Sequence, residues 1–388
     1  MVDYQRVQAL LHEIPPSLPF STSPEIRAEC RALIKQAKEQ GRQTLTHSET
    51  AQVLEAYGIP TATSAYVHSP EEALVVAERF PGPKALKVVH EGNCRPYRYR
   101  KHPHKISAGL LQDLETPEQV AEGVRRLGDK VQEKFPEHAI REYCLQPMQR
   151  GKHSMQICAG ITRDPVFGPL IVFGIGGYKV NVLADRQVAL PPLNMSLASD
   201  VVGRTHAASL IREHSADPER DIQHLCQLLV KLSQMASDLT DLRGLELNPL
   251  LLNRDGMLAV DFAMDLGHPA RFAIMPYPEE LREWVTLNNG WQVEVRPIRA
   301  EDAPLITTFH RQLSEESIRF RYFHNKSNLT QRDLSILSHI NYDRQMAFIA
   351  EHQHDDGSKE MLGVVRVWND PDNIRTEFSI IIRDDLQG

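Results

Sequence analysis

The stretch that decides the fold is Ile161–Asn194, with the sequence ITRDPVFGPLIVFGIGGYKVNVLADRQVALPPLN. Its apolar run Leu170–Phe173 ends at Gly174, and the glycine pair Gly176–Gly177 follows. The next run, Tyr178–Leu183, alternates roughly as a half-buried strand does. We therefore expect two strands joined by glycines, whose backbone can approach a phosphate because no Cβ blocks it. A tight hairpin without a ligand is the alternative.

The composition is that of a globular protein with more than one domain. A chain of 388 residues is too long for one ordinary core, so about two or three domains are expected. The net charge of −7 gives no sign of the basic surface that is typical of nucleic-acid-binding proteins. No apolar run reaches membrane-spanning length, and the N-terminus lacks a signal-peptide pattern. Five scattered cysteines without C-x-x-C spacing suit reduced thiols in a cytoplasm.

The first ninety residues predict alternating helices and strands. A helix is expected at 25–40, and Ser48 is expected to cap a second helix that Gly58 ends. Ser69 is expected to cap a third helix, with Pro70 at its first position. A strand at 84–89 contains Lys87 in an otherwise apolar run. A lysine in a buried strand is costly unless it is paired or bound to an anion. The alternative for Lys87 is a place on an edge strand.

A second informative stretch is 245–266, LELNPLLLNRDGMLAVDFAMDL. Two apolar runs flank Asn253–Gly256, which is a hairpin signal. A turn centred there places Asn248 directly opposite Asp261, with Glu246 two residues along on the same strand face. An amide and carboxylates on one face are the hard oxygen ligands that suit Mg²⁺. Polar residues on a purely structural hairpin are the alternative.

These motifs, in this order, resemble the ATP-grasp domain of ADP-forming (NDP-forming) acyl-CoA synthetases. The resemblance is carried by DPVFGPLIVFGIGG with LPPLN behind it. It is closer still to the form fused to an acetyltransferase domain in Pat-type bacterial protein lysine acetyltransferases. The resemblance implies an α/β (α+β) chain with an ATP-grasp domain and the N-terminal half of a GNAT acetyltransferase domain. The implied bounds are 1–45 for an N-terminal extension, 46–268 for the ATP-grasp domain, 269–290 for a connector and 291–388 for the partial GNAT domain.

The resemblance also implies a nucleotide site. Lys87 is expected to contact ATP or ADP, and Asn248 and Asp261 are expected to bind Mg²⁺. The strand that ends at Gln146 corresponds to the hinge against which adenine stacks. Pro147 replaces the usual acid there and removes one backbone N–H. The implied cofactor-binding residues are Lys87, Gln146, Gly174, Gly176 and Gly177.

Several features depart from the family pattern. Gln156 and Asn181 stand where the family has carboxylates, and amides bind a divalent cation far less strongly. Both changes argue against full phosphoryl-transfer competence. The loop expected to cover the phosphates is rebuilt with arginines and lysines over 95–105. Its guanidinium groups either clamp phosphate oxygens or form a solvated surface run.

The C-terminal part resembles the start of a GNAT domain. VRPIRAED at 295–302 looks like its opening strand and helix, and the stretches 341–350 and 361–388 continue the resemblance. Glu377 lies at the position of the general base that would deprotonate the target lysine. We expect it to be buried at the mouth of a cleft, which raises the pKa of a carboxyl group. An exposed place on an alternating strand is the alternative.

The resemblance further implies that this chain is a fragment. The chain stops at Gly388, where the GNAT turn that binds the pyrophosphate of acetyl-CoA would begin. We therefore expect an incomplete acetyl-CoA site and no acetyl transfer by this chain alone.

Three functions are compatible with these observations. The leading hypothesis is a fragment of a lysine acetyltransferase that acts on metabolic enzymes such as acyl-CoA synthetases, with a regulatory ATP-grasp domain. The alternatives are an ATP-grasp subunit of an ADP-forming acyl-CoA synthetase and a nucleotide-binding module without catalysis. The expected cofactors are ATP (or ADP) and Mg²⁺, with acetyl-CoA in the complete parent. The expected partners are the nucleotide, protein substrates and a second copy of the chain, with neither nucleic acid nor a membrane.

Overall fold

The computed structural model describes most of the chain, namely residues 10, 13, 22–90, 109–134, 140–149, 154–177, 185–254, 256–322, 328–372 and 374–387. Asn181, the predicted strand Tyr178–Leu183 and the basic loop 95–105 lie outside these residues. The chain divides into two compact units. The larger comprises Ser21–Leu193 and Ala198–Arg271, and the smaller comprises Phe272–Gly388 with Met1–Phe20 and Asn194–Leu197. The domain bounds given above stay predictions.

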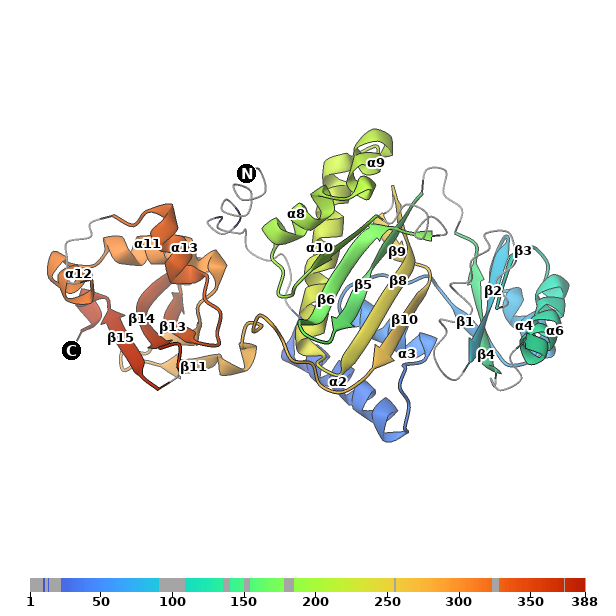
Figure 1. Cartoon of the computed structure of the whole chain (residues 1–388), viewed down its shortest axis with the longest axis horizontal. Helices are drawn as coiled ribbons and strands as arrows, with labels where there is room; N and C mark the ends of the chain where they lie inside the picture. Colours follow the sequence, from blue (N-terminus) through green and yellow to red (C-terminus); the bar gives the residue numbers. More distant parts are fainter. Residues whose placement is uncertain are drawn as a thin grey trace. The chain divides into compact units, whose positions relative to one another are not determined.

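One sheet of the larger unit has the strand order β1-β4-β2-β3 and is antiparallel (Figure 1). Helices α4 and α6 pack against it and bury Leu86 and Leu145. Because the Ser69 hydroxyl accepts from the Glu72 N–H and Pro70 follows, α4 begins where the sequence predicts. The bounds are β1 Ala65–Val67, α4 Pro70–Ala77, β2 Lys84–His90, β3 Leu110–Leu114, α6 Pro117–Lys134 and β4 Ile140–Pro147.

The second sheet of this unit has the order β10-β8-β5-β6-β7, with β9 paired to β8. The long helix α10 packs against β5 and β6 and buries Leu225, Leu228 and Leu232. Its strands are β5 Met155–Asp164, β6 Gly168–Ile175, β7 Arg186–Ala189, β8 Leu242–Asn253, β9 Gly256–Ala259 and β10 Phe262–Leu266. The remaining helices are α2 Pro24–Glu39, α3 His47–Ala56, α8 Met195–Gly203, α9 His206–His214 and α10 Pro218–Asp238.

Two local predictions need correction. Helix α3 is capped by Thr46 instead of Ser48, because Thr46 and Glu49 form a reciprocal capping box. Strand β6 does not end at Gly174 but continues to Ile175. Gly174 pairs there with Arg186 of β7, so it lies inside the strand ladder.

The hairpin of β8 and β9 has the predicted register. Asn253 pairs with Gly256 at the turn, and β10 continues the same pairing along β8. The Asn248 N–H donates to the Asp261 carbonyl at 2.9 Å. Asn248 and Asp261 therefore lie opposite each other, as expected.

The smaller unit is built on an antiparallel sheet with the strand order β11-β12-β13-β14-β15. Helices α11 and α13 cover one face, and the core there includes Ile306, Phe309 and Ile349. Its strands are β11 Glu283–Thr286, β12 Gln292–Pro297, β13 Gln345–Gln353, β14 Lys359–Asn369 and β15 Thr376–Ile382. Its helices are α11 Ala303–Arg311, α12 Glu315–Tyr322 and α13 Gln331–Ser338, with 3-10 turns at Glu279–Leu281, Ala300–Asp302 and Asp384–Leu386.

A buried ion-pair network ties this sheet to its first helix. Arg296 of β12 donates to both carboxylate oxygens of Asp302, at 2.8 and 2.7 Å. It also donates to Glu351 of β13 at 2.5 Å, and Glu351 accepts from Lys359 at 2.6 Å. Burial alone would lower the pKa of Arg296, but the two carboxylates raise it above its ordinary value. The desolvation of this guanidinium is thus offset by paired charges.

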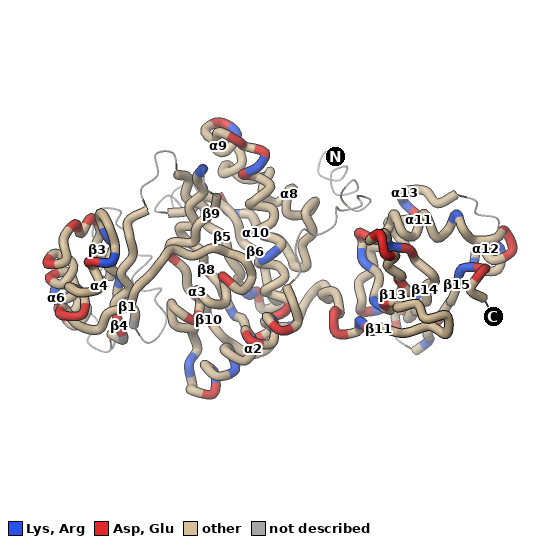
Figure 2. Tube along the Cα trace, turned by 180° about the vertical axis from the view of Figure 1, so that it is seen from behind, with Lys and Arg blue, Asp and Glu red and all other residues tan. Residues whose placement is uncertain are grey.

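Charge is mixed along both units. Acidic and basic residues are interspersed along the described trace (Figure 2). In the described part of the chain, every helix is too short or too polar to cross a lipid bilayer.

The close pairing of β5 with β8 provides a test of stability. A Cβ on Gly160 would lie 2.1 Å from the Leu245 carbonyl oxygen of the paired strand. We expect Gly160→Ala to lower the free energy of unfolding by about 1–3 kcal/mol, because ladder backbone cannot move aside without losing hydrogen bonds. Gly203 of α8 is the matched control, since an added Cβ meets nothing within 4 Å there. Urea denaturation followed by circular dichroism checks both variants, and equal stabilities would contradict this packing.

Candidate functional site

The two sheets of the larger unit meet at Lys87. Its Nζ donates to the Val260 carbonyl at 2.9 Å and approaches Asp261 Oδ1 at 3.5 Å. Strand β2 lies between β4 and β3, so the edge-strand alternative for Lys87 is wrong. Its side chain is 14% exposed and that of Asp261 is 23% exposed. The lysine in the apolar strand is therefore paired across the gap between the two sheets.

Asn248 connects the β8–β9 hairpin to the glycine pair. Its Oδ1 accepts from the Gly177 N–H at 2.7 Å. Gly177 has a φ of +69°, and a Cβ there would lie 1.7 Å from Gln156 Oε1. Only glycine fits this position, both for its backbone conformation and for the space that Gln156 leaves. The structure thus brings Asp261, Asn248, Gly177 and Lys87 into one chain of contacts.

The other two glycines have a structural reason of their own. A Cβ on Gly174 would lie 1.6 Å from the Asp185 carbonyl oxygen, and one on Gly176 would lie 2.3 Å from the Ile157 carbonyl carbon. The Gly176 N–H donates to the Gln156 carbonyl at 2.8 Å. The close approach that requires glycine at these positions is between backbone segments. Phosphate contact by Gly174 and Gly176 stays a prediction.

Gln146 is held at the end of β4. Its side chain is buried, and Nε2 donates to Ser64 Oγ at 2.8 Å. Gln146 Oε1 is buried and has no hydrogen-bond partner among the described residues. An unsatisfied buried acceptor costs about 1–3 kcal/mol, so this oxygen favours a donor from a ligand. The sequence did not point to Ser64, because the segment before β1 carries no periodic pattern.

Cys144 lies opposite Lys87 on the neighbouring strand β4. The thiol is fully buried, and this burial raises its pKa to about 11. The charge of Lys87 partly opposes the shift. The thiol is thus protonated at neutral pH.

The protein supplies too few metal ligands at this place to bind Mg²⁺ without oxygen atoms from a bound molecule or water. Among the described residues, no group of three or more His, Cys, Asp or Glu side chains could hold a metal ion. Asn248 offers an amide oxygen, and Asp261 offers a carboxylate. Mg²⁺ is commonly bound by one or two carboxylates together with substrate phosphates and waters. The two residues fit that pattern, and their metal role stays a prediction.

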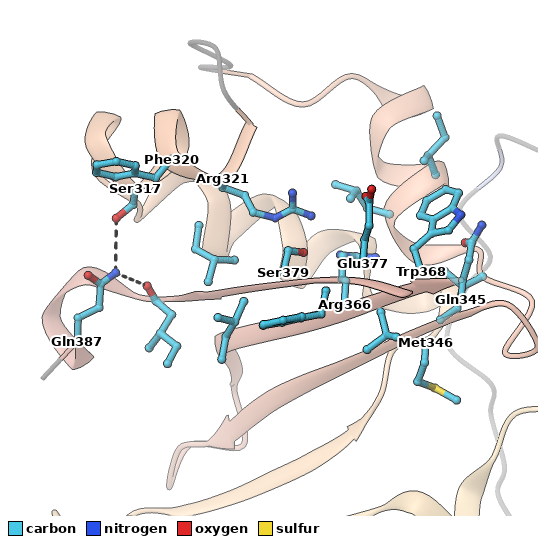
Figure 3. Close-up of a pocket in the computed structure, with 18 residues that line it drawn as sticks. Ser317, Phe320, Arg321, Gln345, Met346, Arg366, Trp368, Glu377, Ser379 and Gln387 are labelled. Atoms are coloured by element: carbon cyan, nitrogen blue, oxygen red, sulfur yellow. Dashed lines mark hydrogen bonds between the residues drawn. The ribbon is translucent and has the colours of Figure 1, made fainter. Parts of the chain in front are cut away.

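Glu377 differs from what the sequence predicted. It pairs with Trp368 but lies on the edge strand β15 and is exposed, not buried. An edge strand has a neighbour on one side only, which leaves this carboxylate open to solvent. Glu377 does line a cleft of about 870 Å³ in the smaller unit (Figure 3). Its role as a general base stays a prediction.

Comparison with known proteins identifies the family of the larger unit. The profile of the ATP-grasp domain matches residues 36–266. The beta subunit of ADP-forming acetate–CoA ligase II of Pyrococcus furiosus is 27% identical over 236 residues, which are 61% of this chain and 96% of that subunit. The larger unit is therefore an ATP-grasp domain of the ADP-forming acyl-CoA synthetase type, and the predicted mixed α/β fold with an ATP-grasp domain is confirmed.

A solved structure and a second kind of relative extend the comparison. Dinucleotide-forming acetyl-coenzyme A synthetase 1 of Candidatus Korarchaeum cryptofilum, solved with coenzyme A, Ca-AMPCP and HgCl⁺, is 26% identical with a TM-score of 0.52. The match covers 61% of this chain and 99% of that one. An acetyltransferase of Pseudomonas aeruginosa is 32% identical over 106 residues, which are 27% of this chain and 56% of that protein.

The contact across the two sheets can be measured directly. We expect Lys87→Met to lower the free energy of unfolding by about 1 kcal/mol or more, because it leaves the Val260 carbonyl without its donor. Lys35→Met is the control, since the Lys35 side chain is 78% exposed. A double-mutant cycle of Lys87→Met with Asp261→Asn should give a non-zero coupling energy by urea denaturation. Strict additivity would contradict the pairing.

Proposed function

The chain belongs to the ATP-grasp domain family, and from this premise we propose that it is the nucleotide-binding part of an ADP-forming acyl-CoA synthetase. The observation that carries this proposal is the convergence of Lys87, Asp261, Asn248 and Gly177 where the two sheets meet. A cation, a carboxylate, an amide oxygen and a backbone N–H at one place suit a polyphosphate with its metal ion.

Each residue has a distinct part in binding. Lys87 donates to the phosphate oxygens from the floor of the cleft, where partial burial strengthens its charge. Asn248 and Asp261 hold Mg²⁺, which neutralises phosphate charge when bound. Gln146 lies near the end of β4, the strand proposed to line the adenine. Gly177 holds Asn248 in place through its N–H.

The overall reaction then forms acyl-CoA, ADP and phosphate from ATP, a carboxylic acid and coenzyme A. One named relative is a separate beta subunit of an acetate–CoA ligase, and the similar solved structure is an acetyl-coenzyme A synthetase bound to coenzyme A. We therefore propose a coenzyme A-binding partner subunit, assembly into an oligomer, and a cytoplasmic setting. Gln156, whose side chain lies beside Gly177, weighs against high turnover because it replaces a carboxylate.

Calorimetry with Mg-ATP tests the binding site. We expect the wild-type chain to bind Mg-ATP, and Asp261→Asn and Asn248→Ala each to weaken binding at least about tenfold through loss of oxygen ligands. Asp129→Asn on α6 is the control, because this exposed carboxylate lies on a helix outside the site. An Asp261→Asn variant that binds as well as the wild type would refute the assignment.

Turnover separates two versions of the proposal. With a coenzyme A-binding partner subunit, the chain should convert ATP, acetate and coenzyme A into acetyl-CoA, and Gln156→Glu should increase the rate. Mg-ATP binding without any product, for the wild type and for Gln156→Glu, would identify a nucleotide-binding module without catalysis.

Protein lysine acetylation, which the sequence put first, is the second candidate. The comparisons favour it less than acyl-CoA synthesis. It is supported by the similarity to an acetyltransferase of Pseudomonas aeruginosa and by the place of Glu377 in a cleft.

An acyl-CoA synthetase is incubated with acetyl-CoA and this chain, and mass spectrometry of its lysines tests this second candidate. Acetylation that Glu377→Gln lowers at least about 100-fold would favour it, since a general base contributes this much. Glu283→Gln, on the exposed strand β11, is the matched control. A transfer rate that both variants leave unchanged would remove Glu377 from the mechanism.

A further inference from the structure

The cleft of the smaller unit contains two arginines. Its volume is about 870 Å³, and it is lined by α12, α13 and the strands β13, β14 and β15. Arg321 enters it from α12 and Arg366 from β14 (Figure 3). A second, smaller pocket that reaches the core residue Phe309 is lined by the same two arginines. Both guanidinium groups therefore face one connected space.

Among the described residues, no carboxylate pairs with either arginine, although Arg321 lies over the Tyr322 ring, 5.1 Å from its centroid. In the part of the chain that the structure describes, neither side chain makes a hydrogen bond or an ion pair. Glu377 lines the same cleft but forms no ion pair with either described arginine. Arg296 shows the contrast, because this buried guanidinium is held by three carboxylates.

The environment of Arg366 makes this imbalance costly. Burial, and then the positive charge of Arg321, lower the pKa of Arg366 to about 10. Two like charges in a partly desolvated space repel each other. An oxyanion between them removes both costs, since guanidinium groups bind carboxylate and phosphate oxygens in a fork geometry.

Most of the remaining lining residues are apolar, and some of them are exposed. Trp368 of β14 is 55% exposed and Ile336 of α13 is 51% exposed. Large apolar side chains beside a charged pair are typical of sites that take a small amphipathic ligand, and the volume lies in the range of such sites. A bare inorganic ion would leave these side chains in water.

We propose that this cleft binds a small organic anion, whose carboxylate or phosphate group lies between Arg321 and Arg366 and whose apolar part lies against Ile336 and Trp368. This site belongs to the smaller unit and does not depend on the nucleotide site. It goes beyond the nucleotide-binding function proposed above, and it gives Arg321 and Arg366 a role in the cleft where the second candidate function places Glu377.

Calorimetry on the full chain tests the proposal with four probes: hexanoate, hexyl phosphate, inorganic phosphate and hexanol. We expect hexanoate or hexyl phosphate to bind at least about tenfold more tightly than inorganic phosphate or hexanol, because only they offer both an anion and an apolar part. The stronger of the two identifies a carboxylate or a phosphate as the natural group. Arg321→Gln and Arg366→Gln should each weaken that binding at least about tenfold.

Arg332→Gln on α13 is the matched control, because this arginine is exposed and does not line the cleft. Circular dichroism checks that each variant is folded, and if Arg366→Gln unfolds, Arg321→Gln decides. No binding of either organic anion, or an equal loss in Arg332→Gln, would overturn the proposal. Inorganic phosphate binding as tightly as hexyl phosphate would overturn the apolar part. Mg-ATP binding measured on the same variants should not change, so failure here leaves the nucleotide site untouched.

Discussion

The contact of Lys87 with the β9–β10 connection is the constraint on which the larger unit depends. A lysine in the middle of an apolar sheet is tolerated only if its charge is met, and here the partners come from a different sheet. These partners of Lys87 are the Val260 carbonyl and the Asp261 carboxylate. The same contact joins the two sheets of the larger unit. The proposed nucleotide site therefore uses residues that also connect the two sheets.

The rest of the site follows from local backbone rules. The register of β8 with β9 and β10 sets Asn248 opposite Asp261, and the Asn248 amide then reaches Gly177. Gly177 must be glycine for its positive φ and for the neighbouring Gln156 side chain. The local hairpin places Asn248 and Asp261, whereas Gly177 and Lys87 reach them from segments far away in the sequence.

This explains which features the sequence could predict. The hairpin register followed from the turn residues alone, so the pair Asn248 and Asp261 was predictable, as was the helix that Ser69 caps. The partner of Gln146 was not, because Ser64 lies in a segment without periodicity and meets it only through tertiary packing. The exposure of Glu377 was only the alternative in the sequence, since strand order, and not strand sequence, decides which strand is at an edge.

The most direct measurement is a crystal structure of the chain with a non-hydrolysable ATP analogue and Mg²⁺. The convergence of Lys87, Asp261 and Asn248 predicts a phosphate oxygen about 3 Å from Lys87 Nζ and the metal ion on Asp261. A nucleotide bound elsewhere, with Lys87 still on the Val260 carbonyl and no metal ion at Asp261, would contradict it.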